Sequence, residues 1–220
     1  SDLFLDKLPS SSDIINDLFS LVNCSVFEEI VFCGMGEPLL RYDCVMEVCQ
    51  AIKKQKNNIK IRMDTSGLFW SKIKRLDILD WLDILSVSLN AENSEKYNEL
   101  CNPQIADAYD ILMDFLQILK KTEVGYIKKN KTFPEVRLSV VDTSEEDFIP
   151  DSGRDGYEKG GFPIPDFDKC QKVASKFGWT LITKRLFRDS TDKKWNNELM
   201  QNSCSCGKSI DICKDCLYRH

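Results

Sequence analysis

The chain has 220 residues, of which 42% are hydrophobic and 30% are charged, an ordinary balance for a globular protein. Its net charge of −5 and its pI of about 5.1 argue against nucleic acid or an anionic membrane as partner, since both require a basic face. The sequence has no membrane-length apolar run and no signal pattern, so we expect a cytoplasmic protein with its ten cysteines reduced.

Hydrophobic periodicity predicts strands and helices that alternate along the chain. The expected elements, in chain order, are a helix over Asp13–Val22, a strand over Ile30–Cys33, a helix over Tyr42–Lys54, a strand over Ile59–Thr65, a helix over Lys72–Leu82, a strand over Ile84–Asn90, a helix over Ala106–Lys120, a strand over Val136–Val141, a helix over Phe167–Phe177 and a strand over Trp179–Leu186. Strands separated by helices indicate an α/β fold with a parallel sheet.

Three of these strands have one polar and one apolar side. The polar positions are Lys60, Arg62 and Asp64, then Ser86, Ser88 and Asn90, then Arg137 and Ser139. A polar inner face suggests a barrel open enough for a polar ligand. An antiparallel sheet with one wet face is the weaker alternative, because helices separate the strands. The cations Arg62, Arg137 and Lys184 indicate either an anionic ligand in the lumen or internal ion pairs.

The segment "GMGEP" (34–38) follows the first strand, where parallel α/β folds bind ligands. Gly34 and Gly36 let the main chain approach a ligand closely, Glu37 can pair with a cation, and Pro38 stiffens the turn. A plain strand-to-helix turn would have a similar composition, so this motif alone is only suggestive.

Four segments in order, "FCGMGEPLLR", "IRMDTSGL", "DILSVSLNAENSEKYNELCNP" and "PEVRLSVVDTSEE", resemble the radical S-adenosylmethionine (SAM) enzymes. The nearest match is the subgroup associated with TatD-type hydrolases, and 7-carboxy-7-deazaguanine synthases are more distant. The resemblance implies a partial (β/α)₆ barrel over residues 1–187, with an inserted loop at 143–166.

The resemblance also implies a SAM site. Gly34, Gly36, Glu37 and Pro38 would hold the amino group, Thr65 and Ser66 match a Thr-Asn-Gly element with Ser in place of Asn, Ser88 and Asn90 would reach the ribose or carboxylate, and Val140 would flank the adenine.

The sequence lacks one family element, the Cys-x₃-Cys-x₂-Cys loop that holds a [4Fe–4S] cluster. We expect that the chain begins just after this loop, so the cluster ligands are not in it. The alternative is a degenerate barrel that has kept its pocket and lost its chemistry.

The C-terminal extension over residues 188–220 is rich in cysteine. Cys204, Cys206, Cys213 and Cys216 have spacings typical of a zinc site or an auxiliary iron–sulfur cluster. The alternative is a disordered tail with free thiols.

The sequence therefore predicts a radical SAM enzyme, or its barrel portion. With the cluster, bound SAM and an electron donor, the enzyme would generate a 5′-deoxyadenosyl radical that acts on an unidentified substrate. A TatD-type hydrolase partner is implied by the resemblance. The alternative function is a non-catalytic SAM-pocket or zinc-binding scaffold module.

Overall fold

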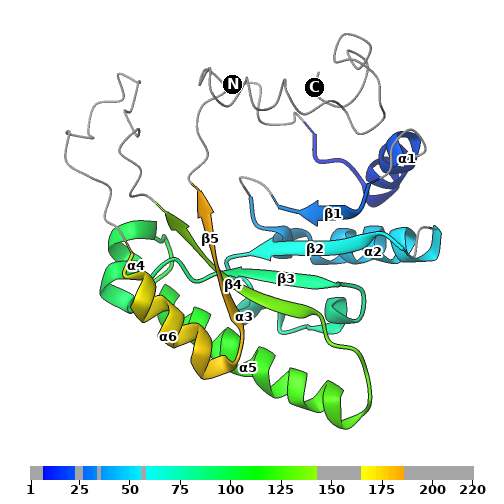
Figure 1. Cartoon of the computed structure of the whole chain (residues 1–220). Helices are drawn as coiled ribbons and strands as arrows, with labels where there is room; N and C mark the ends of the chain where they lie inside the picture. Colours follow the sequence, from blue (N-terminus) through cyan, green and yellow to red (C-terminus); the bar gives the residue numbers. More distant parts are fainter. Residues whose placement is uncertain (1–6, 23–26, 34–35, 56–57, 143–164, 186–220) are drawn as a thin grey trace, which may run out of the picture. The chain divides into compact units, whose positions relative to one another are not determined.

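The computed structural model describes residues 7–22, 27–33, 36–55, 58–142 and 165–185 (Figure 1). These residues form two compact units. One contains residues 7–22, 27–30, 43–55 and 58–60, with helix α1 (Ser11–Val22) and most of α2 (Tyr42–Gln55). The other contains residues 31–33, 36–42, 61–142 and 165–185, and it holds the candidate site. No helix within these ranges is both long and apolar enough to cross a membrane.

Five strands form one sheet in chain order: β1 (Glu29–Phe32), β2 (Lys60–Thr65), β3 (Ile84–Ser88), β4 (Glu135–Asp142) and β5 (Thr180–Arg185). The pairs β2–β3, β3–β4 and β4–β5 are parallel. This topology confirms the α/β class with a parallel sheet.

The strand register gives the sheet a polar and an apolar face. Asp64 lies opposite Ser86, and Ser86 lies opposite Arg137, so these side chains share one face. The other face carries the alternate residues, and its fully buried members are Ile61, Met63, Leu85, Val87, Leu138 and Val140.

Helix α6 (Phe167–Phe177) packs against β4 and β5, and α5 (Ala108–Lys128) packs against α6. Figure 1 shows both helices on one side of these strands.

One ion pair shows that the sheet is curved. Lys184 Nζ on β5 lies 2.9 Å from Asp64 Oδ2 on β2, with β3 and β4 between the two strands. Neighbouring strands are about 4.8 Å apart, so these residues would be about 14 Å apart across a flat sheet. The contact therefore requires a sheet that bends toward its polar face.

Two features of the helical layer differ from the sequence prediction. The expected helix over Lys72–Leu82 is wrong: α3 (Trp70–Ile73) ends at Lys74, which has φ 51°, and a 3₁₀ turn, η2, follows at Asp77–Asp80. A left-handed residue cannot continue a right-handed helix. The sequence reading also missed helix α4 (Ser94–Cys101), which is capped by Asn93 through its bond from the Lys96 amide.

Gly67 makes the sharp turn that follows β2. Its φ is +74°, and a Cβ atom built on it would lie 2.5 Å from Cδ1 of Phe115 on α5. Both the backbone conformation and the close packing therefore require glycine here.

We expect Gly67→Ala to lower the free energy of unfolding by about 2 kcal/mol or more, from left-handed strain and the clash with Phe115. Gly125→Ala is the matched control, because a Cβ atom there meets nothing within 4 Å. Since Gly125 lies inside α5, this change should stabilise by up to about 1 kcal/mol. Urea unfolding measures the free energy of unfolding of both variants. Equal changes in this free energy would contradict the requirement for glycine at position 67.

Tyr42 holds the segment after β1 to the 3₁₀ turn η2. Its hydroxyl donates to Asp77 Oδ1 at 2.7 Å and accepts from the Ile78 amide at 2.9 Å, while the Arg75 guanidinium lies 4.5 Å from the ring centroid. Hydrogen bonds from Arg75 are the main cause that lowers the pKa of Asp77 to about 2, with a smaller contribution from Tyr42.

A carboxylate with a lowered folded-state pKa stabilises the protein above its unfolded value of about 3.9, and this stability is lost as the pH falls toward 2. We expect Asp77→Asn to cost about 0.5–1 kcal/mol at pH 7, because the side chain is about half exposed and screened by solvent. The deficit against wild type should shrink below pH 4. A constant deficit in urea unfolding from pH 7 to pH 3 would be evidence against this ionic contribution.

Candidate functional site

The Glu37 carboxylate ties the loop after β1 to the end of β2. Its Oε1 accepts from the Leu39 amide at 3.2 Å and from Thr65 Oγ1 at 2.6 Å. Its Oε2 accepts from the amide and the hydroxyl of Ser66, at 2.8 and 2.7 Å. A carboxylate can accept about four hydrogen bonds, so these four donors occupy all of its acceptor positions. Glu37 therefore acts as a clamp between two strand ends.

The carboxyl end of β3 lies beside this clamp. Thr65 is opposite Val87 in the parallel β2–β3 pair, so the residues that follow, Ser66 and Ser88, extend along the same edge of the sheet. Asn90 comes next, with φ +57°, and its amide donates to the Ser139 carbonyl at 3.1 Å. The structure thus brings the Gly36–Pro38 and Ser88–Asn90 segments to one edge.

Helix α4 adds two groups that the sequence reading did not include among the candidate site residues. Asn90 Nδ2 lies 3.5 Å from the Cys101 thiol, and the buried Tyr97 is also on this helix. Burial raises the pKa of Tyr97, and the nearby Cys101 and Glu37 add to the effect. The Asn93 cap followed by polar residues was the signal for this helix. At neutral pH, the edge thus presents hydroxyl and amide groups.

The other predicted site residues lie in different surroundings. Gly36 is exposed, and a Cβ atom there would meet nothing within 4 Å, which leaves its backbone open to a ligand. Pro38 begins the 3₁₀ turn η1 (Pro38–Arg41), for which Glu37 is the cap. Val140 is fully buried on the apolar face, so its side chain does not reach the polar side of the sheet. Gly34 lies outside the described residues.

The cations on the polar face form internal ion pairs. Lys184 and Arg62 approach Asp64 at 2.9 and 3.7 Å, and Arg137 pairs with Glu135 at 2.6 Å. Of the two interpretations of these cations, an anionic ligand or internal pairing, the geometry favours internal pairing.

The described part of the chain contains no group of three or more His, Cys, Asp or Glu side chains placed to hold a metal ion. Cys33, at the end of β1, is exposed and is a free thiol. The four predicted ligands Cys204, Cys206, Cys213 and Cys216 lie outside the described residues.

The sequence was compared with known proteins. No protein-family model matches it. A probable dual-specificity RNA methyltransferase RlmN 1 of Protochlamydia amoebophila (strain UWE25) is 33% identical over 107 residues, 44% of this chain and 30% of that protein. A probable dual-specificity RNA methyltransferase RlmN of Chlorobium chlorochromatii (strain CaD3) is 30% identical over 156 residues, 65% of this chain and 41% of that protein. The chain therefore spans less than half the length of these relatives.

These matches support the radical SAM superfamily for this chain. They do not show the TatD-associated subgroup.

The same matches overturn one prediction: the acidic balance was taken to exclude nucleic acid, yet two proteins of similar sequence are named RNA methyltransferases. Net charge is a sum over the chain and does not describe the surface beside one strand edge, so the exclusion was wrong.

We expect Glu37→Gln to lower the free energy of unfolding by about 1–3 kcal/mol, because the glutamine amide nitrogen cannot accept a hydrogen bond and one set of donors loses its partner. The Ser66 amide, fixed in the backbone, has no alternative geometry. Glu95→Gln, an exposed carboxylate in the first turn of α4, is the matched control and should change stability by less than about 0.5 kcal/mol. Equal unfolding midpoints in urea for both variants would rule out the clamp.

Proposed function

We propose that this chain is the SAM-binding part of a radical SAM enzyme that modifies RNA. The resemblance to RlmN proteins supports the substrate class, and the joined ends of β2 and β3 support a ligand site at this edge. The partial barrel, supported by the curved sheet, belongs to the same proposal. The TatD-type partner remains a prediction.

The geometry favours a specific division of roles at the SAM site. Since Glu37 already accepts four hydrogen bonds, it positions the loop, and the exposed backbone at Gly36 offers carbonyl oxygen to the SAM ammonium. Ser88 and Asn90 follow on the neighbouring strand and offer hydroxyl and amide groups to the ribose or carboxylate. The residues present therefore fit the polar part of SAM.

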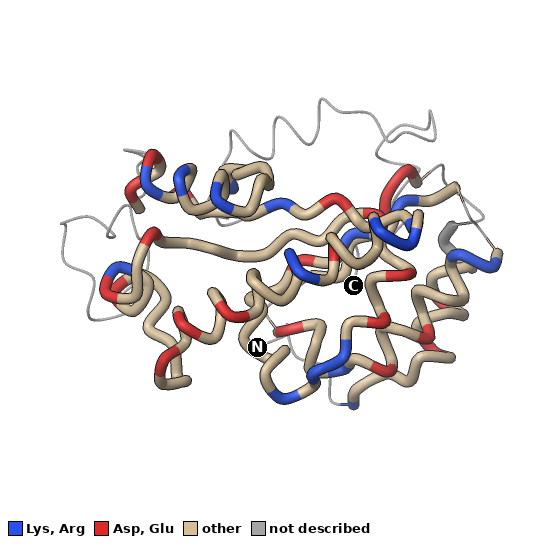
Figure 2. Tube along the Cα trace, turned by 90° about the horizontal axis from the view of Figure 1, so that it is seen from below, with Lys and Arg blue, Asp and Glu red and all other residues tan. Residues whose placement is uncertain are grey.

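A [4Fe–4S] cluster and SAM together supply one-electron chemistry in this superfamily. The described residues contain no set of side chains placed to hold a metal ion. The role proposed for the groups at the strand edge is to bind and orient SAM. Basic and acidic residues are both spread along the described part of the trace (Figure 2). The basic runs within it are short, such as Lys53–Lys54 and Lys128–Lys129. We therefore expect RNA to be selected by local contacts at the strand edge rather than by charge alone.

The observation that carries this proposal is the meeting of the Gly36–Pro38 and Ser88–Asn90 segments at one sheet edge. We expect this chain to bind S-adenosylhomocysteine in isothermal titration calorimetry. Ser88→Ala combined with Asn90→Ala should weaken the affinity tenfold or more, since two polar contacts are lost. Asp114→Asn, an exposed change on α5, should leave it unchanged.

The full-length gene product, reconstituted with iron and sulfide and reduced with dithionite, tests the activity. Methyl-labelled SAM and total RNA are the substrates, and label in the RNA is the expected result. SAM cleavage with unlabelled RNA would reject the substrate class. Binding of S-adenosylhomocysteine without SAM cleavage would favour a non-catalytic SAM-pocket module, and no binding at all would reject the site.

A further inference from the structure

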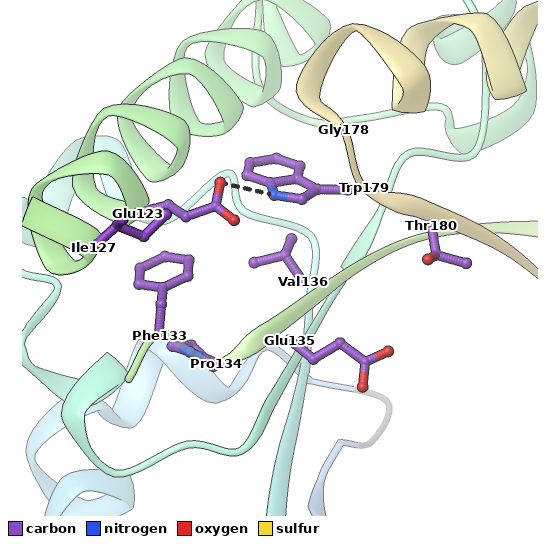
Figure 3. A pocket seen from close by; sticks show the side chains of 9 residues that line it. All are labelled: Glu123, Ile127, Phe133, Pro134, Glu135, Val136, Gly178, Trp179 and Thr180. Atoms are coloured by element: carbon purple, nitrogen blue, oxygen red, sulfur yellow. Dashed lines mark hydrogen bonds between the residues drawn. The ribbon is translucent and has the colours of Figure 1, made fainter. Parts of the chain in front are cut away.

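A cavity of about 400 Å³ lies beside the amino ends of β4 and β5, at the opposite strand ends from the candidate SAM site. Its volume is within the range of small-molecule sites. The last turns of α5 and the segments that lead into the two strands border it on the protein side, and it is open to solvent (Figure 3). The side chains that shape it are Glu123, Ile127, Phe133, Glu135, Val136 and Trp179.

Glu123 is held in place by one of its two carboxylate oxygens. Oε2 accepts from Lys120 Nζ at 2.6 Å and from the Trp179 indole nitrogen at 3.2 Å. The other oxygen is turned toward the space between Phe133, Val136 and Trp179 (Figure 3), and no described residue donates a hydrogen bond to it. A carboxylate oxygen thus faces a cavity that is lined by aromatic and aliphatic side chains together with Glu135 and Thr180.

These surroundings favour a cation with an apolar stem. The Glu123 side chain is 21% exposed, and partial shielding from water strengthens its attraction for a positive charge. Trp179 is buried and its ring stacks on Phe177, so the indole is a firm wall. At the rim, Ile127 is 63% exposed and offers apolar surface for a stem.

We propose that this cavity binds an alkylguanidinium group, which donates to the free oxygen of Glu123 and lies against the aromatic walls. Guanidinium is planar, stacks on aromatic rings and is less strongly hydrated than ammonium, so it loses less on entering the cavity. The group can belong to a free small molecule or to an arginine side chain of a protein. This site is independent of the proposed SAM function.

Lys120 is the competing cation. Its Nζ pairs with Glu123 and lies 5.6 Å from the centroid of the Trp179 ring. Removal of this charge should strengthen guanidinium binding, whereas removal of the Glu123 charge should weaken it. The two neighbouring residues thus predict opposite effects of similar substitutions.

The test uses N-butylguanidinium and its neutral near-isostere N-butylurea, titrated into the ¹⁵N-labelled chain and followed at the Trp179 indole N–H signal. We expect butylguanidinium to bind tenfold or more tightly than butylurea and to shift this signal. Glu123→Gln keeps one carbonyl oxygen for Lys120 and Trp179, and should reduce the preference to within twofold. Lys120→Met should raise the affinity a few fold, and Asp114→Asn should change nothing.

A blocked Gly-Arg-Gly tripeptide, compared with its citrulline analogue, identifies the source of the group. Binding of butylguanidinium and this tripeptide supports an arginine side chain of a protein, and binding of butylguanidinium alone supports a free small molecule. Three results would overturn the proposal. The first is equal affinity of the chain for butylguanidinium and butylurea, and the second is no shift of the Trp179 signal at millimolar butylguanidinium. The third is an unchanged preference for butylguanidinium in a Glu123→Gln variant that unfolds at the same urea concentration as wild type. None of these outcomes bears on S-adenosylhomocysteine binding.

Discussion

The candidate site depends on the four hydrogen bonds that Glu37 accepts. They join the segment that carries Glu37 to the end of β2, so Glu37, Thr65 and Ser66 hold one relative position. The same contacts orient Thr65 and Ser66, and Thr65 Oγ1 in turn accepts from the Gly67 amide at 3.0 Å. Gly67 then turns the chain against Phe115. A single carboxylate therefore links the glycine-rich loop, the edge of the sheet and the helical layer.

The two faces of the sheet divide packing from recognition. The apolar face is buried under helices, and Val140 lies there. On the polar face the charges are paired, with Asp64 between Lys184 and Arg62. Charged groups that already have an ionic partner resist a phosphate or carboxylate ligand, because such a ligand would have to compete with that partner. The hydroxyl and amide groups at the strand ends are therefore better suited to bind SAM.

The sequence predicted the alternation of strands and helices because hydrophobic period and helix caps are local signals. The helix over Phe167–Phe177 was predicted to the residue, since Gly178 ends it with φ +70°. Local signals failed where a single residue broke a pattern, as Lys74 does in the expected 72–82 helix. The grouping of Glu37 with Thr65 and Ser66 followed from parallel topology, but its hydrogen bonds did not. Whether a carboxylate is free or already bonded depends on contacts between segments that sequence spacing does not encode.

Glu37 and Glu123 show why that distinction decides function. Both are carboxylates partly shielded from solvent. Glu37 lies near the carboxyl end of β2 and accepts from the Ser66 amide, and Glu123 lies near the amino end of β5 and accepts from Lys120 and Trp179. Glu37 uses both oxygens and has no capacity left, so it can position a ligand site but contributes little direct attraction. Glu123 uses one oxygen and leaves the other facing a cavity. Remaining hydrogen-bond capacity, rather than charge or residue type, thus separates a structural clamp from a receptor for a cation.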